Sequence, residues 1–270
     1  MKKLIYFLFI PLLLLQGCSS DSDNNDNNNN GSSTILCKSI RYNESDATNI
    51  RNYRDEYIYV GNKLFEMKSY YNDVLVGPPD VVFYTGDLIT EIKFYDELNR
   101  LDGNTVCTYN NSGQLIESIY YDKGILDVKD TYTYNQNGTI TQLTYYNYNK
   151  QETLKSNSTL TYTNGDLVKI DVIEYDGAQV YNNYTITYLY DDKNSPFKNV
   201  HSSFKKILIG LDEFGLPSGN NHNVIKKTVI NSNPNILNST KNYQYIYNSD
   251  NYPTKQTSSN SGSSIVEYTY

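Results

Sequence analysis

Apolar and polar residues alternate in short runs along most of this chain. In LIESIYY (residues 115–121) and TITQLTYY (139–146), isoleucine, threonine and tyrosine alternate with one another and with polar residues. Alternation with a period of two places side chains on opposite faces of a β-strand, and β-branched and aromatic residues suit that pleated surface. A short helical segment is expected only in FKKILIGLDEFG (204–215). The pattern predicts an all-β fold.

One tyrosine-rich phrase recurs along the chain at nearly regular spacing. The tyrosine that ends each Tyr-x-Tyr-like pair is found at Tyr59, Tyr84, Tyr109, Tyr134, Tyr162, Tyr190 and Tyr247. The successive spacings are 25, 25, 25, 28, 28 and 57 residues. Periods of about 20 to 50 residues are typical of repeat architectures. Because 57 is close to twice 28, we expect a degenerate unit between residues 200 and 230.

Each repeat has the pattern of two strands joined by a tight turn. The turns contain Gly86, Gly113, Gly138 and Gly165, which would supply the positive φ that such turns require. Longer connections, such as NDVLVGPPD (72–80), fall at the opposite edge. The expected fold of residues 34–270 is a long antiparallel meander of about eight tyrosine-rich β-hairpin repeats, forming a curved or curled sheet.

The N-terminus has the composition of a secretory signal peptide over residues 1–17. Lys2 and Lys3 precede an apolar run from Leu4 to Leu15, which is too short to cross a bilayer because about 20 residues are needed. The Cys18 that follows resembles the modified cysteine of the bacterial lipobox. This resemblance implies acylation of Cys18 and anchoring in a membrane.

Residues 18–33 are expected to form a tether, because SSDSDNNDNNNNGSS (19–33) has no apolar side chain that could be buried. Its acidic start, Asp21, Asp23 and Asp26, resembles the export signal of Bacteroidota surface lipoproteins. The resemblance implies an outer-membrane location facing the exterior. The alternatives are a location on the periplasmic face of the outer membrane and a spacer that carries no localisation signal.

Two segments in the last third vary the repeated phrase. YLYDDKNSPFKNV (188–200) and YIYNSDNYPTKQT (245–257) share Tyr-x-Tyr, an acidic polar turn, and then proline and lysine. They resemble the YD repeats of Rhs-type proteins and, more closely, tyrosine-rich repeat lipoproteins of Bacteroidota. The resemblance implies the β-repeat fold and a contact with a carbohydrate or a surface. It implies no catalytic residue.

The net charge narrows the classes of partner that the chain is expected to bind. Removal of residues 1–17 takes away Lys2 and Lys3 and moves the formal charge from −7 to −9, which argues against nucleic acid or anionic lipid as a partner.

Cys37 and Cys107 lie in segments with strand patterns. They are candidates for a disulfide in an oxidising compartment or, equally, for small buried thiols.

The chain offers little catalytic chemistry. It has two histidines, His201 and His222, and no motif with metal-ligand spacing or a nucleophile elbow. We therefore expect no enzyme activity, no cofactor and no metal site. The predicted role is non-catalytic binding or interaction at the envelope, with a glycan or an envelope protein as partner.

The 29 tyrosines leave two alternatives open. A carbohydrate-binding module would expose several of them as stacking platforms, whereas a structural scaffold would pack them in ladders. The segment GLDEFGLPSGNNHNV (210–224) breaks the repeat and is either a tolerated insertion or a binding loop. In the second case the candidate binding residues are Tyr188, Tyr190, Phe214, Asn220, Asn221 and His222.

Overall fold

A computed structural model describes residues 34–45, 50–148, 151–207, 212–213, 216–217, 221–259 and 264–270. These residues belong to one compact unit, Thr34–Tyr270. The predicted signal peptide, Cys18 and the tether, and the candidates Phe214 and Asn220, lie outside the described residues.

The described residues form nineteen strands and one short helix. Their bounds are β1 Ser39–Ser45, β2 Ile50–Val60, β3 Lys63–Tyr71, β4 Val74–Leu75, β5 Asp80–Thr85, β6 Leu88–Tyr95, β7 Leu101–Tyr109, β8 Leu115–Asp122, β9 Ile125–Tyr134, β10 Ile140–Tyr148, β11 Gln151–Thr163, β12 Asp166–Asp176, β13 Gln179–Tyr190, α1 Ser202–Ile207, β14 Asp212–Glu213, β15 Leu216–Pro217, β16 Val224–Asn231, β17 Ser239–Tyr247, β18 Pro253–Ser259 and β19 Ser264–Thr269. The all-β prediction is confirmed, and the short helix begins two residues before the segment in which it was expected.

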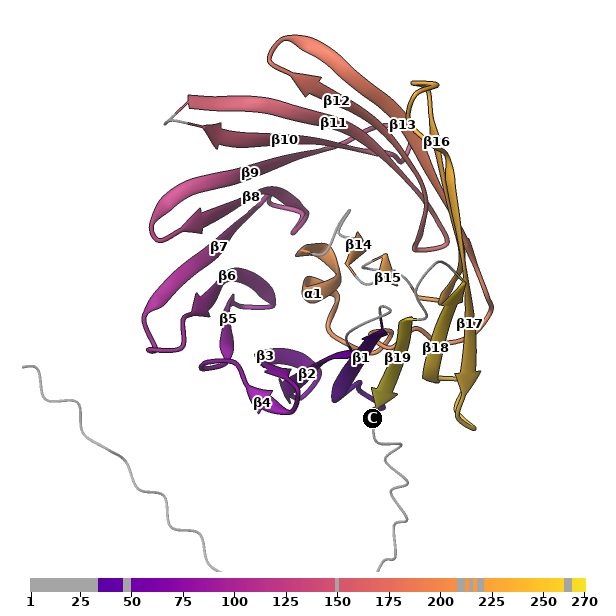
Figure 1. Ribbon diagram of the computed structural model, residues 1–270. Helices are drawn as coiled ribbons and strands as arrows, with labels where there is room; N and C mark the ends of the chain where they lie inside the picture. Colours follow the sequence, from indigo (N-terminus) through magenta and orange to yellow (C-terminus); the bar gives the residue numbers. More distant parts are fainter. Residues whose placement is uncertain are drawn as a thin grey trace, which may run out of the picture. The chain divides into compact units, whose positions relative to one another are not determined.

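The sheet closes on itself, which corrects the predicted open meander. Neighbouring strands pair antiparallel around the ring, and β19 pairs with β1 in register from Ser39↔Thr269 to Glu44↔Ser264. The result is a closed 16-strand antiparallel β-barrel (Figure 1). The expectation was wrong because the alternation of each strand is the same in an open and in a closed sheet. Closure depends on pairing between the two ends of the chain, which also removes both free edges.

Between Tyr190 and Val224 the described residues add no strand to the barrel wall, because β14 and β15 pair only with each other. β13 pairs directly with β16, from Tyr184↔Asn231 to Tyr190↔Val224. The intervening residues 191–223, here called the plug, replace a tight turn. Figure 1 shows the plug elements α1, β14 and β15 inside the ring of strands. The barrel end that holds the plug and the glycine turns is called the plug rim, and the opposite end is called the distal rim.

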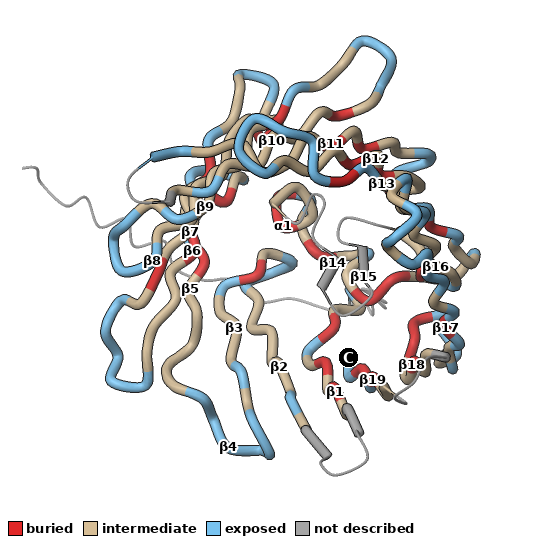
Figure 2. Tube along the Cα trace, turned by 45° about the horizontal axis from the view of Figure 1, so that its top comes forward, coloured by how far each residue is buried: buried red, intermediate tan, exposed pale blue. Residues whose placement is uncertain are grey.

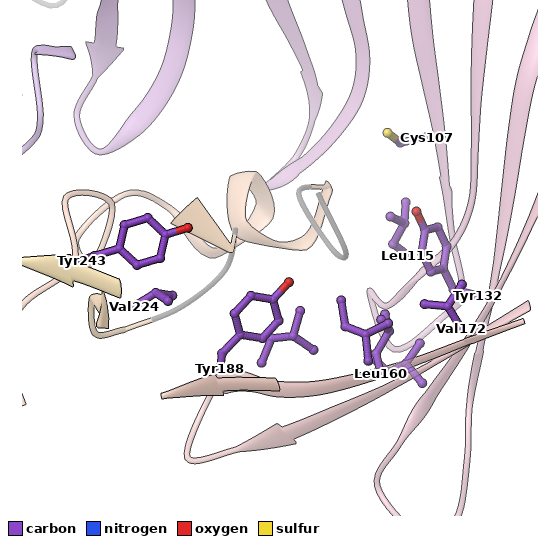
Figure 3. Close-up of a cluster of buried hydrophobic side chains, with 11 residues drawn as sticks. Cys107, Leu115, Tyr132, Leu160, Val172, Tyr188, Val224 and Tyr243 are labelled. Atoms are coloured by element: carbon purple, nitrogen blue, oxygen red, sulfur yellow. The ribbon is translucent and has the colours of Figure 1, made fainter. Parts of the chain in front are cut away.

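The core lies between the inner face of the barrel, near the plug rim, and the plug. Leu64, Ile89 and Leu115, which follow turns at the plug rim, are each 0% exposed. Phe204 of α1 packs in the same cluster as Leu64 and Ile89. Figure 2 shows buried positions on the inside of the ring, and Figure 3 shows tyrosines and aliphatic residues of the largest cluster converging there.

A repeated hydrogen bond explains the tyrosine content near the plug rim. In six repeats a tyrosine hydroxyl donates to a backbone carbonyl of the preceding repeat, with O···O distances between 2.6 and 2.9 Å. The pairs are Tyr59 to Cys37, Tyr84 to Leu64, Tyr109 to Ile89, Tyr190 to Leu167, Tyr245 to Val224 and Tyr270 to Pro253. The ring fills the core while the hydroxyl satisfies a backbone acceptor, so tyrosine suits this position better than phenylalanine does.

Candidate functional site

The plug is tied to several turns of the plug rim. The backbone N–H of His201 donates to the carbonyl of Asn62 at 2.9 Å, and the backbone N–H of Asn194 donates to the carbonyl of Asn251 at 3.0 Å. The Lys206 ammonium donates to the carbonyl of Gly113 at 2.6 Å. These turns belong to different repeats, so the plug connects repeats that are distant in sequence.

The sequence-predicted binding residues that the structure describes lie at the plug rim. The backbone N–H of Asn221 donates to Asp166 Oδ1 at 2.7 Å, and His222 Nδ1 lies 2.7 Å from Asp166 Oδ2. Tyr188 is 3% exposed within the largest hydrophobic cluster, and Tyr190 packs against that cluster. The structure therefore brings these four residues to one end of the barrel. Asp166, only 5% exposed, is a hydrogen-bond partner of Asn221 and His222 that the sequence reasoning missed, although it follows the Asn-Gly turn at 164–165.

A half-buried carboxylate, Asp191, lies where the plug enters and leaves the barrel wall. Asp191 Oδ1 accepts a hydrogen bond from the backbone N–H of Asn223 at 3.1 Å, and Asp191 Oδ2 accepts one from the Tyr247 hydroxyl. Burial and the neighbouring Asp191 carboxylate raise the pKa of Tyr247 well above its usual range. The contact with Asn223 joins the two ends of the plug, and the contact with Tyr247 joins Asp191 to β17.

The distal rim has a different surface, because the exposed tyrosines are found there. Among the described tyrosines, those at least 36% exposed are Tyr53 (39%), Tyr71 (42%), Tyr146 (48%) and Tyr181 (64%). All four lie near strand ends at the distal rim. The rings of Tyr53 and Tyr71 are 5.2 Å apart between centroids.

Strand register places three of these rings on the inner face. Tyr53 lies opposite the buried Tyr42, and Tyr71 lies opposite Tyr53. Tyr146 lies opposite Val128, which in turn lies opposite Tyr120 on the inner face. Residues directly opposite each other in antiparallel strands share a face. Solvent therefore reaches aromatic rings on the inner face at this rim.

Polar groups cover the inner face between the core and the distal rim. Asp130 accepts hydrogen bonds from Gln142 Nε2 at 3.0 Å and from Thr144 Oγ1 at 2.6 Å. The Tyr184 hydroxyl donates to Glu174 at 3.2 Å. Burial, together with the nearby Asp55, raises the pKa of Asp80 to about 6. Carboxylates, amides and hydroxyls beside exposed rings suit hydrogen bonding and stacking with a polyhydroxylated ligand.

Charged side chains lie on the outer face of the barrel. Lys169 and Asp171 flank the buried Ile170 on β12 and form an ion pair at 2.8 Å. Glu91 and Lys93 flank the buried Ile92 on β6 at 3.5 Å. Because strand side chains alternate, a charged residue between two inward positions points outward.

A row of outward charges also crosses three neighbouring strands. Glu267 of β19 lies opposite both Arg41 of β1 and Lys255 of β18. The outer face is therefore polar on several sides of the ring.

The two cysteines are buried and free in this structure. Cys37 is 0% exposed in the cluster around Ile40, and Cys107 is 5% exposed in the cluster around Leu115. Burial raises the pKa of Cys107 to about 11, which disfavours its thiolate at neutral pH. In this structure both cysteines behave as small apolar residues.

No metal-binding group emerges from the part of the chain that the structure describes, where no three histidine, cysteine or carboxylate side chains are suitably grouped. Within the same residues, no helix is long and apolar enough to cross a membrane.

The fold and the site define a plugged antiparallel β-barrel with charged side chains on its outer face, and solved structures of similar fold exist. A porin-like protein from Bacteroides vulgatus superposes with a TM-score of 0.55 at 14% identity, covering 87% of this chain and 98% of that protein. A porin-like protein from Bacteroides uniformis gives a TM-score of 0.51 at 15% identity, covering 87% of this chain and 97% of that protein. At this identity the similarity concerns the fold. No family model and no curated protein matches the sequence.

Proposed function

We propose that this chain is a non-catalytic binding protein of the bacterial outer membrane. In this proposal it is anchored by a lipid on Cys18, and its barrel lies in water and binds a glycan at the distal rim. The single observation that carries the binding role is the position of the exposed tyrosines. All four lie at the distal rim, and three of them face inward beside polar groups.

The outward charges support a barrel in water. A lysine or arginine on the lipid-facing side of a transmembrane barrel costs about 2–4 kcal/mol at the bilayer midplane. Arg41, Lys93, Lys169 and Lys255 all lie within strands and point outward. A membrane-spanning barrel would need an uninterrupted apolar band at these positions. This barrel therefore shares its fold with the porin-like proteins while its outer face favours contact with water.

The position of the chain ends supports anchoring through the plug rim. The carbonyl of Ile35 accepts a hydrogen bond from Asn199 of the plug at 2.9 Å. The backbone N–H of Lys38 donates to the carbonyl of Thr269 at 2.7 Å. A tether that joins the barrel at residue 34 would thus attach at the plug rim. The distal rim would then be free to meet a ligand outside the membrane.

Binding to an array of bacterial and plant polysaccharides tests this proposal. The triple variant Tyr53→Ala, Tyr71→Ala, Tyr146→Ala removes the three inward rings, and we expect it to lose binding because stacking platforms contribute most of the contact area. The outward Tyr121→Ala variant is the matched control and should bind like the wild type. Unchanged binding by the triple variant would contradict the proposal.

A structural scaffold is the second candidate function. It is supported by the remaining described tyrosines, which are buried or half-buried, and by the repeated hydroxyl-to-carbonyl hydrogen bond. A scaffold would bind no glycan on the array, either as the wild type or as the triple variant. The proposal that the plug loop with Asn221 and His222 itself contacts a ligand remains a prediction, and the triple variant would leave such binding unchanged.

A further inference from the structure

Several carboxylates lie on the inner face of the barrel, between the core and the distal rim. Asp55 lies opposite the fully buried Ile40, and Glu174 follows the buried Val172 by two residues. Because side chains alternate along a strand, both carboxylates point inward. The same relation to a buried neighbour holds for Asp80 beside Val82 and for Asp130 beside Tyr132.

These inner carboxylates differ from the outer ones in their partners. Among the described residues, none of the four has a lysine, arginine or histidine side chain within ion-pair distance. Asp55, for example, accepts a hydrogen bond from the Ser69 hydroxyl at 2.7 Å, whereas the outward Asp171 forms an ion pair with Lys169. The inner wall therefore carries negative charge that neutral groups alone satisfy, and such a wall attracts cations.

The inward lysines of β16 and β17 lie at a different level. Lys227 lies opposite the buried Tyr188, and Lys241 lies opposite Lys227. Asn231, four residues farther along β16, lies opposite Tyr184, whose hydroxyl donates to Glu174. Four strand residues correspond to about 13 Å, so both lysines are nearer the plug rim than Glu174 is.

Glu174 has acceptor capacity that the described residues do not use. Its Oε1 accepts the hydrogen bond from the Tyr184 hydroxyl at 3.2 Å, and its Oε2 has no hydrogen-bond partner in the described part of the chain. Burial and the Glu174 carboxylate raise the pKa of Tyr184 to about 12, so this hydroxyl remains a donor at neutral pH. Glu174 is partly exposed, and solvent therefore reaches it.

A buried amide beside Glu174 also has an unused acceptor. Asn182 lies directly opposite Glu174 and is 6% exposed. Asn231 Nδ2 donates to the carbonyl of Leu237 at 3.0 Å, so Asn231 Oδ1 accepts from Asn182 Nδ2 at 3.3 Å. This chain of amides fixes the orientation of Asn182, whose Oδ1 is buried without a hydrogen-bond partner among the described residues. Such an acceptor is unfavourable until a donor reaches it.

The carboxylate and the amide oxygen can share one donor group. Residues directly opposite each other in an antiparallel pair have Cβ atoms about 4.5–5.5 Å apart. An ammonium group carries three N–H donors and no acceptor, which suits two neighbouring oxygen acceptors, one of them charged. A neutral hydroxyl would supply one donor and no charge.

The geometry points to the Glu174–Asn182 pair as the contact for an amino group of the ligand, which makes an amino sugar the ligand class of the glycan site. This inference rests on the proposed function and adds the charge class of the glycan. The inward tyrosines of the distal rim would contact the sugar rings, and the other inner carboxylates would attract further amino groups of the same chain.

Calorimetric titration of the mature protein at slightly acidic pH, where sugar amines are protonated, tests the inference. The probes are a chitosan oligosaccharide, the chitin oligosaccharide that differs from it by N-acetylation, and spermidine. The chitosan oligosaccharide should bind at least about tenfold more tightly than the chitin oligosaccharide, because acetylation removes the charge and two of the three N–H donors. Spermidine, which has amines but no sugar ring, should bind more weakly than the chitosan oligosaccharide.

Two variants separate this contact from a general charge effect. Glu174→Gln keeps the shape of the side chain and should weaken chitosan binding by about tenfold, with chitin binding unchanged. Asp171→Asn removes an outward carboxylate from the same strand and is the matched control, which should bind like the wild type. Melting temperatures of both variants would show that each remains folded.

Three outcomes would overturn the inference: equal binding of the chitosan and chitin oligosaccharides, an equal loss of chitosan binding in Glu174→Gln and Asp171→Asn, or spermidine binding as tight as chitosan binding. Binding of neutral glycans that requires Tyr53, Tyr71 and Tyr146 but not Glu174 would also overturn it and leave the proposed function standing. The absence of binding to every neutral and amino glycan would overturn both.

Discussion

At the scale of single residues, the tyrosine hydroxyl is the feature that distinguishes this barrel wall. A core tyrosine normally needs a partner for its hydroxyl, and here the partner is a backbone carbonyl that follows a turn in the preceding repeat. The same contact recurs in six repeats. Each tyrosine therefore joins two neighbouring hairpins by packing and by one hydrogen bond.

Replacement of Tyr109 by phenylalanine tests this role. The Tyr109 hydroxyl donates to the carbonyl of Ile89 at 2.7 Å. We expect Tyr109→Phe to lower the free energy of unfolding by about 1 kcal/mol. For a domain of this size the melting temperature should fall by about 2–4 °C, measured by circular dichroism. The outward Tyr121→Phe variant is the control, and an equal loss in both variants would show that the hydrogen bond is not the cause.

At the scale of elements, the tight turns determine how each hairpin begins and ends. Gly113, Gly138 and Gly165 have φ of 69°, 83° and 86°, which confirms the predicted positive values. Their surroundings differ. A Cβ at Gly138 would meet no atom within 4 Å, whereas a Cβ at Gly165 would lie 2.5 Å from Asn221 Nδ2 of the plug. The glycine at 165 is therefore required both by the turn and by contact with the plug.

Valine substitutions should separate these two requirements. Gly138→Val should cost about 1–2 kcal/mol of unfolding free energy from backbone strain alone. Gly165→Val should cost more, because it also displaces the Asn221 side chain from the carbonyl of Asn164. Ser112→Ala, in an exposed turn position, should have little effect. Chemical denaturation would measure the loss of unfolding free energy in each variant. An equal loss at Gly138 and Gly165 would contradict the role of the plug contact.

At the scale of the whole molecule, closure and the plug give the barrel two unlike ends. The plug rim holds the core, the start of β1 and the end of β19, and the distal rim holds the exposed tyrosines. A lipid on Cys18 would therefore hold the molecule by its closed end. In this proposal, the attachment of the protein to the membrane depends on this single residue.

Cys18→Ser tests that expectation. Without the thiol, acylation cannot occur, and the protein should leave the outer-membrane fraction or remain unprocessed. Membrane fractionation and mass spectrometry of the N-terminal peptide would detect the change, with Cys37→Ser as the control that keeps Cys18. Recovery of an acylated Cys18→Ser protein in the outer membrane would contradict the prediction.

The local features of this protein could be predicted from its sequence, because each depends on a few neighbouring residues. The alternation in segments such as 115–121 indicates strands, and the Asn-Gly turns at 137–138 and 164–165 indicate hairpins with positive φ. These are consequences of side-chain alternation and glycine stereochemistry.

Only the tertiary structure decided that the sheet closes into a barrel, where the plug lies, and which tyrosines are buried and which are exposed. The pairing of Ser39 with Thr269 joins the two ends of the fold, and no local pattern determines such a contact. The insertion after Tyr190 could have extended into solvent, but its hydrogen bond to the buried Asp166 and the packing of Phe204 in the core hold it in the barrel. Tyr71 and Tyr84 look alike in sequence, yet one lies at the exposed distal rim and the other in the core. A side chain's exposure depends on which strands surround it in space.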